Sequence, residues 1–81
     1  MARILFFGRF SDLSPPLDIE LPSSVKNKAS LTQYLASEIE GFADLAALPD
    51  TRISVNMLVS MSEVDVTNSD EIAFMSALSG G

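Results

Sequence analysis

The sequence predicts a single α+β domain in which a mixed sheet of about five strands packs on one main helix. Three observations lead to this prediction. The chain has 81 residues, which suits one hydrophobic core and leaves no room for a second. Its composition, with 47% hydrophobic residues, is that of a globular protein. Apolar residues recur with the two-residue period of strands near both ends, and with a helical period between them.

The N-terminal residues predict a β-hairpin. Residues 3–10 alternate as a first strand, and a turn follows at residues 11–16, where prolines interrupt regular structure. Residues 17–21 alternate as the second strand, and Pro22 ends it. In the first strand we expect one face to carry Ile4, Phe6, Gly8 and Phe10, and the outward face Arg3, Leu5, Phe7 and Arg9.

A helix is expected after the hairpin. Asn27 is a suitable N-cap, because its side chain can accept a hydrogen bond from the free amides of the first turn. Gly41 is expected to end the helix in the left-handed conformation. From Lys28 onward a single apolar stripe, which needs a sheet to cover, is made of Leu31, Tyr34, Leu35, Ile39 and Phe42.

The C-terminal half predicts a short helical turn over residues 42–50 and then three strands. Residues 52–56 and 57–61 predict a strand and a short strand, joined by a tight turn near Asn56. Residues 62–69 are polar and loop-like, and the last strand follows Asp70, with inward positions at Ile72 and Phe74; in the loop, Val64 and Val66 are expected to point inward.

This order of elements predicts a β-grasp, or ubiquitin-like, fold. A hairpin, a crossover helix and a returning strand pair place the first and last strands side by side and parallel at the centre of the sheet. We expect residues 1–75 to form the domain and residues 76–81 to form a flexible tail.

Composition excludes several kinds of chemistry. The sequence has no His and no Cys, so no histidine base, thiolate nucleophile or disulfide can form from its side chains. A net charge of −6 argues against binding to nucleic acid or anionic membranes and mildly favours a basic protein partner. The acids Glu63, Asp65, Asp70 and Glu71 have no spacing typical of a cation loop, so no metal site is expected. The longest strongly apolar run, residues 4–7, is too short to span a bilayer, and we expect a cytoplasmic protein.

The last two residues, Gly80 and Gly81, suggest a functional terminus. Glycines have no Cβ and bury no apolar area, so they suit a tail that threads a narrow channel and presents the Gly81 carboxylate to another enzyme. A frayed terminus and a flexible cloning linker are the ordinary alternatives.

A second candidate site is an apolar patch on the sheet face opposite the helix. Strand alternation places Phe7 and Met75 outward, and Val59 on the short strand would complete the patch. The alternative is a register error of one residue, which would turn all three side chains into the core.

The sequence resembles the sulfur-carrier family that includes the small subunit of molybdopterin synthase and the thiamin-pathway carriers. The resemblance extends over the whole chain. It rests on residues 4–7 (Ile-Leu-Phe-Phe), the Val55-Asn56 pair, residues 70–74 (Asp-Glu-Ile-Ala-Phe) and the terminal Gly80-Gly81. The segment at residues 42–50 favours the molybdopterin branch, since the thiamin-pathway carriers are usually shorter.

The resemblance implies a role without catalysis by this chain alone. An ATP-using adenylating enzyme would activate the carboxylate of Gly81, a sulfur donor would convert it to a thiocarboxylate, and the large synthase subunit would transfer that sulfur to a pterin precursor. Gly80 would give access to the terminus, and no cofactor would be bound. The residues that would contact partners are Phe7, Val59, Met75, Leu78 and Ser79.

Three other functions stay open: a thiamin-type sulfur carrier, a ubiquitin-like protein modifier and a plain β-grasp interaction module. The sequence also departs from the family pattern at three places. Residues 76–79 (Ser-Ala-Leu-Ser) stand where relatives often have prolines, Ser69 replaces a common turn glycine, and Ser11 occupies a position that is often basic. These departures concern contacts with partners rather than the terminal chemistry.

Overall fold

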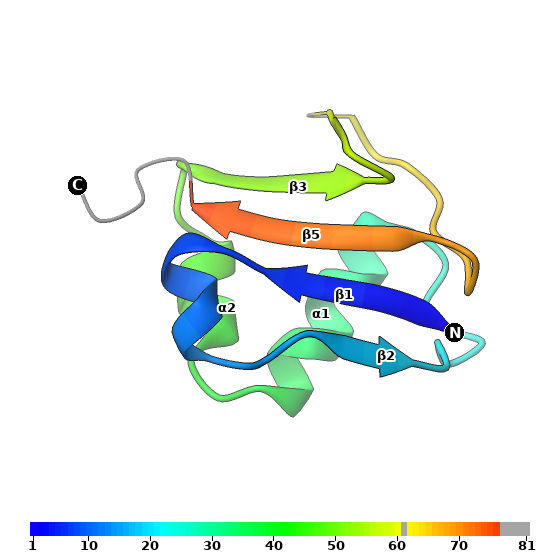
Figure 1. The fold of residues 1–81 in the computed structure, drawn as a ribbon, viewed down its shortest axis with the longest axis horizontal. Helices are drawn as coiled ribbons and strands as arrows, with labels where there is room; N and C mark the ends of the chain where they lie inside the picture. Colours follow the sequence, from blue (N-terminus) through cyan, green and yellow to red (C-terminus); the bar gives the residue numbers. More distant parts are fainter. Residues whose placement is uncertain (61, 77–81) are drawn as a thin grey trace.

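The computed structural model describes residues 1–60 and 62–76, which form an α+β arrangement with a five-stranded mixed sheet and one main helix. Both α-helices lie behind the sheet in Figure 1. The strand order in the sheet is β2-β1-β5-β3-β4. The strands are β1 (Ala2–Phe6), β2 (Leu17–Ile19), β3 (Thr51–Val55), β4 (Leu58–Val59) and β5 (Glu71–Ser76), and the helices are the 3-10 helix η1 (Gly8–Asp12), α1 (Lys28–Glu38) and α2 (Phe42–Ala46).

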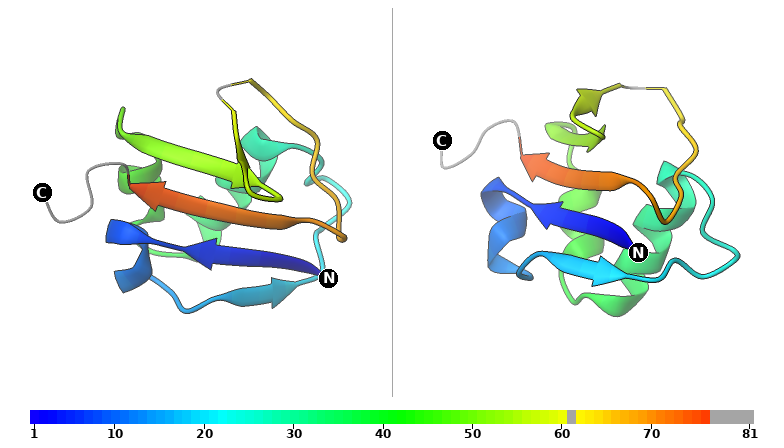
Figure 2. Two further views of the ribbon diagram at one scale, coloured as in Figure 1. Left: turned by 45° about the horizontal axis from the view of Figure 1, so that its top comes forward. Right: turned by 45° about the vertical axis from the view of Figure 1, so that its right-hand side comes forward.

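The first and last strands are parallel neighbours at the centre of the sheet, as the element order predicts (Figure 2). Ile4 pairs with Ile72 and Phe6 with Phe74. The other three strand pairs, β1–β2, β3–β5 and β3–β4, are antiparallel. Since a parallel pair needs a crossover connection, α1 and α2 lie in the chain between β1 and β5.

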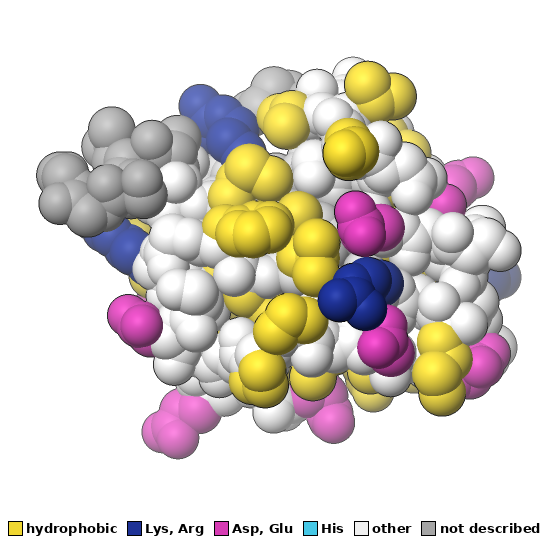
Figure 3. All heavy atoms as spheres, in the orientation of Figure 1, with side chains coloured by type: hydrophobic (Ala, Val, Ile, Leu, Met, Phe, Trp, Pro, Cys, Tyr) yellow, Lys and Arg dark blue, Asp and Glu magenta, His cyan; other side chains and the backbone are white. Residues whose placement is uncertain are grey.

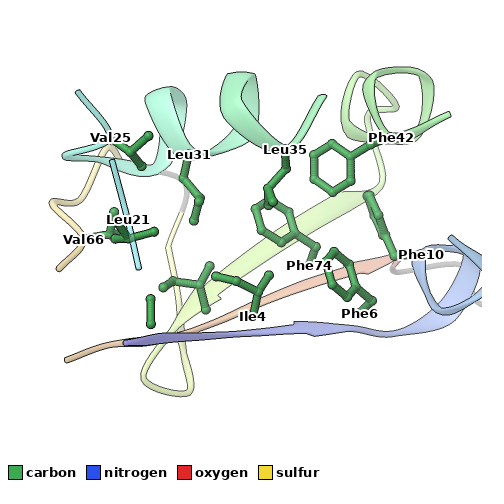
Figure 4. Packing of buried hydrophobic residues seen from close by; sticks show 12 residues of the cluster. Ile4, Phe6, Phe10, Leu21, Val25, Leu31, Leu35, Phe42, Val66 and Phe74 are labelled. Carbon is green, nitrogen blue, oxygen red and sulfur yellow. The ribbon is translucent and has the colours of Figure 1, made fainter. Parts of the chain in front are cut away.

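Four phenylalanines form the centre of the core, between the sheet and the helices (Figure 4). Phe74 lies 5.0 Å from Phe42 and 6.0 Å from Phe10, measured between ring centroids. Phe6 stacks against Phe74 at 6.3 Å with an interplanar angle of 17°. Aromatic pairs at these separations add to the free energy that burial itself supplies, which matters in a domain with so small a core.

The first strand is shorter than predicted. It ends at Phe6, and Gly8–Asp12 form a 3-10 helix rather than the end of a strand. Gly8 has a φ of +61°, a left-handed conformation that breaks the strand, and its carbonyl accepts a hydrogen bond from Ser11 Oγ at 2.7 Å. The prediction that Phe10 faces the core is confirmed, but this 3-10 helix, and not strand alternation, buries its side chain.

The predicted cap of the main helix is confirmed. Asn27 Oδ1 accepts a hydrogen bond from the Ser30 backbone N–H at 2.8 Å, and the Asn27 N–H donates to Ser30 Oγ at 3.1 Å. The end of the helix differs from the prediction, because α1 stops at Glu38 and Ile39 is extended. Gly41 is left-handed as expected, with a φ of +86°, but it precedes α2, so Phe42 of the predicted stripe belongs to the second helix.

The strands of the C-terminal half agree with the predictions except at their ends. Strand β3 ends at Val55 and the short strand β4 covers only Leu58–Val59. Asn56 and Met57 form the tight turn between them. In the loop that follows, Val66 is buried and Val64 is half-buried, as expected for inward-pointing residues.

Candidate functional site

The sheet face that points away from the helices carries the predicted apolar patch. Because Phe6 and Phe74 point into the core, their neighbours Leu5 and Ala73, which pair with each other across β1 and β5, point to the opposite face. Met75 follows on β5 at the next outward position. The predicted register is therefore correct at both central strands.

Two of the three predicted patch residues have side chains that are about half exposed. The side chain of Phe7 is 50% exposed and that of Val59 is 54% exposed, while Met75 is half-buried. Val59 belongs to the same face because it pairs with Ser54, which pairs in turn with Ala73. Figure 3 shows hydrophobic side chains gathered in the middle of this face. We call Leu5, Phe7, Val59, Met75 and the small, buried Ala73 of the same face the outer patch.

The outer patch adjoins the end of β5, where the tail begins. Gly8 lies against Ser76, the last residue that the structure describes. A Cβ added to Gly8 would lie 3.1 Å from Ser76 Cβ and 3.3 Å from its backbone nitrogen, which is tighter than most such contacts. On its other side Ser76 pairs with Thr51, and its Oγ donates to Asp50 Oδ2 at 3.3 Å. Neighbouring segments thus hold the root of the tail on both sides.

Sequence reasoning did not identify Gly8 as part of the site. The signal that could have found it is a glycine within an apolar strand pattern, which often marks a bend or a close approach of two backbones. Its left-handed φ also turns the chain into the 3-10 helix directly after Phe7, which is still extended and keeps its side chain exposed.

The other end of β5 is fixed by a polar network around Asp70. The side-chain amide of Asn56 donates to Asp70 Oδ1 at 2.9 Å, and the Thr67 N–H donates to Oδ2 at 2.8 Å. Asn56 Oδ1 in turn accepts from the Glu71 N–H at 3.0 Å, which continues the ladder between β3 and β5. The hydrogen bond from Asn56 is the main reason that the pKa of Asp70 is lowered from its ordinary value of 3.8.

The described residues contain no group of three or more His, Cys, Asp or Glu side chains arranged to hold a metal ion. Asp70 instead accepts hydrogen bonds from Asn56 and Thr67. Of the helices in the same part of the chain, none has both the length and the apolar character needed to cross a membrane.

Four of the predicted site residues, Leu78, Ser79, Gly80 and Gly81, lie outside the described residues. Their roles stay predictions from the sequence. Comparison with known proteins found no matching protein-family model and no matching curated protein.

Replacing Gly8 by alanine should destabilise the domain. The substitution forces a side chain into the left-handed conformation, which costs about 1–2 kcal/mol, and also presses the new Cβ against Ser76. Gly41→Ala is the matched control, because Gly41 is also left-handed but a Cβ there would meet only Leu13 Cδ2 at 3.4 Å. Urea denaturation should show a larger loss of unfolding free energy for Gly8→Ala. Equal losses would contradict the close packing of Gly8 on Ser76.

The Asp70 network should make stability depend on pH in the acid range. Because the folded-state pKa is lowered, the charged carboxylate stabilises the fold above the ordinary value of 3.8, and this contribution disappears as the pH falls through the folded pKa. Thermal unfolding between about pH 6 and pH 2 should therefore show a smaller acid-induced decrease in Tm for Asn56→Ala than for the wild type. The control is Glu40→Gln, which removes an exposed acid outside this network and should leave the acid-induced decrease in Tm as in the wild type. An equally large decrease in Asn56→Ala and in the wild type would contradict the stabilising role of the Asn56–Asp70 hydrogen bond.

Proposed function

We propose that this chain is a β-grasp sulfur-carrier protein, the small subunit of a molybdopterin synthase. The observation that carries the proposal is the outer patch beside the end of β5, because it joins a docking surface to the root of the predicted tail. In this role the protein works in the cytoplasm with protein partners and without nucleic acid or membrane. Its partners are an ATP-using adenylating enzyme and the large catalytic subunit.

The fold supports this proposal at the level of topology. A parallel central pair, a hairpin at each side and a crossover that contains the main helix are compatible with the β-grasp arrangement. The same arrangement directs the last strand outward from the centre of the sheet, so that the tail would leave the domain next to Phe7 and Met75.

The proposed chemistry takes place at the carboxylate of Gly81 and needs no catalytic side chain from this protein. A carboxylate oxygen attacks the α-phosphorus of ATP and pyrophosphate leaves, which gives an acyl-adenylate with a good leaving group. A hydrosulfide sulfur that attacks the acyl carbon displaces AMP and gives the thiocarboxylate directly. If the donor is a persulfide, its outer sulfur displaces AMP to form an acyl disulfide, and a thiol of the partner then reduces the S–S bond, which releases the thiocarboxylate and leaves a disulfide. The absence of His and Cys from the sequence agrees with a chain whose partners supply the catalysis.

The outer patch provides the docking energy in this proposal. Phe7, Val59 and Met75 would be covered by the partner, while Leu78 and Ser79 enter its channel and Gly80 allows close approach to the reacting carbon. Burying an aromatic side chain fully is worth about 1.5–3 kcal/mol, so covering the exposed half of Phe7 contributes roughly 1 kcal/mol.

Intact-mass analysis of the protein purified from its own cells tests the terminal chemistry. We expect a species in which sulfur replaces one oxygen, located in the C-terminal peptide. Deleting Gly80 and Gly81 should abolish molybdopterin formation in a reconstituted reaction. Activity that survives the deletion would overturn the carrier role, and isopeptide-linked conjugates of the intact protein would instead indicate a ubiquitin-like modifier.

The substitution Phe7→Asp tests the docking surface. A charge at the half-exposed Phe7 should leave folding intact but weaken binding to the large subunit by about tenfold or more, as measured by calorimetry. Gln33→Asp, at an exposed position on α1, is the control and should bind as the wild type does. Unchanged affinity in Phe7→Asp, with both variants folded by circular dichroism, would show that the outer patch is not the docking surface.

A further inference from the structure

The β3–β4 hairpin displays apolar side chains that the proposed function does not explain. Met57 is 80% exposed and Leu58 is 75% exposed, both more than Phe7. Together with Val59 they make three consecutive exposed apolar residues in a domain whose core is small. A contiguous exposed apolar segment on a small protein commonly marks an interaction site.

The turn that carries these side chains has an unusual backbone conformation. Asn56 and Met57 have φ values of +52° and +71°, both in the left-handed region. A two-residue turn of this kind usually has glycine at its second position, and a methionine there is unfavourable for the backbone. Two hydrogen bonds join the turn to the start of β5. The Asn56 N–H donates to the Glu71 carbonyl at 2.7 Å, and the side-chain amide of Asn56 donates to Asp70. The chain therefore keeps a methionine at the tip at a cost to the backbone.

The hairpin also forms an edge of the sheet. Among the strands that the structure describes, β4 comes last in the sheet order, and β3 is its only neighbour. Val55 and Leu58 flank the two-residue turn and face each other in the register. In such a hairpin this pair exchanges hydrogen bonds, so that the next residue, Val59, points its N–H and C=O away from β3. These outward groups are a template for another strand.

The side chains beside this edge indicate the chemistry of a matching strand. Leu58 points to the face opposite Val59 and, with Val55 and Val64, lines a hollow of about 320 Å³. Two carboxylates, Asp65 and Asp70, line the same hollow. An added strand would therefore meet an apolar surface bordered by negative charge.

We propose that the β4 edge binds an extended segment of a partner protein that carries both apolar and basic residues on one face, at positions two apart along the strand. The segment adds to the sheet beside Val59, places apolar side chains against Leu58 and basic side chains near Asp65 and Asp70. A second copy of this chain is a poorer occupant, because two molecules of net charge −6 repel each other. The proposal stands independently of whether Gly81 carries sulfur.

A peptide titration of the full-length protein tests this edge. The probe is an acetylated and amidated peptide of the repeat valine-threonine-lysine-threonine, in which valine and lysine share one face of the strand, and its matched control replaces each lysine by glutamate. We expect the lysine peptide to shift the backbone amide signals of Leu58, Val59 and Ser60 in nitrogen-15 NMR spectra and to slow the hydrogen exchange of the Val59 amide. The glutamate peptide should produce no such shifts.

Three variants locate the binding. Leu58→Asp removes the apolar contact, and Val59→Pro removes an outward N–H that makes no bond to β3. Each variant should bind the lysine peptide with an apparent affinity at least tenfold lower than that of the wild type. Phe7→Asp should bind the lysine peptide as the wild type does, because Phe7 lies on the outer patch and not at the edge.

Several results would overturn the proposal. Equal binding of both peptides would exclude charge complementarity, and shifts centred on Phe7 and Met75 would place the peptide on the outer patch. Shifts at Leu58 and Val59 that depend on protein concentration without peptide would identify self-association instead. Retention of binding in a folded Val59→Pro variant would exclude strand addition.

Discussion

The parallel pairing of β1 with β5 is the constraint on which the rest of the structure depends. Its register places Ile4 beside Ile72 and Phe6 beside Phe74, so that both phenylalanines point towards the helices and meet Phe42. A slip of one residue would turn this whole set to solvent. In a domain of 81 residues with a small core, that loss would remove most of the apolar burial available for folding.

The same register produces the candidate docking face. Because side chains alternate along a strand, each phenylalanine directed into the core leaves its neighbours, Leu5 and Ala73, on the opposite face. Phe7 extends that face at the point where the first strand stops. Gly8 then turns the chain into the 3-10 helix and packs against Ser76, which brings the exposed aromatic ring and the end of β5 together.

Strand β5 connects two regions with separate proposed roles. Its last described residue, Ser76, is held by Gly8 and Thr51 near the outer patch. Its first residue, Glu71, is bonded by Asn56, the residue that also starts the exposed hairpin turn. The central strand thus has Ser76, beside the outer patch, at one end, and Glu71, bonded to the hairpin turn, at the other. Val59 belongs to both regions, so partners at the outer patch and at the β4 edge would compete for this residue.

The sequence by itself determined what local pattern and chemistry control. It predicted the order of elements, the Asn27 cap, the turn at Asn56 and the outward position of Phe7, because alternation, capping and turn preferences act over a few residues. Only the tertiary structure decided where β1 stops, because the conformation of Gly8 depends on the close approach of Ser76 from the other end of the chain. It also decided the early end of α1 at Glu38 and the exposure of Leu58 at the sheet edge, since packing against distant segments determines both.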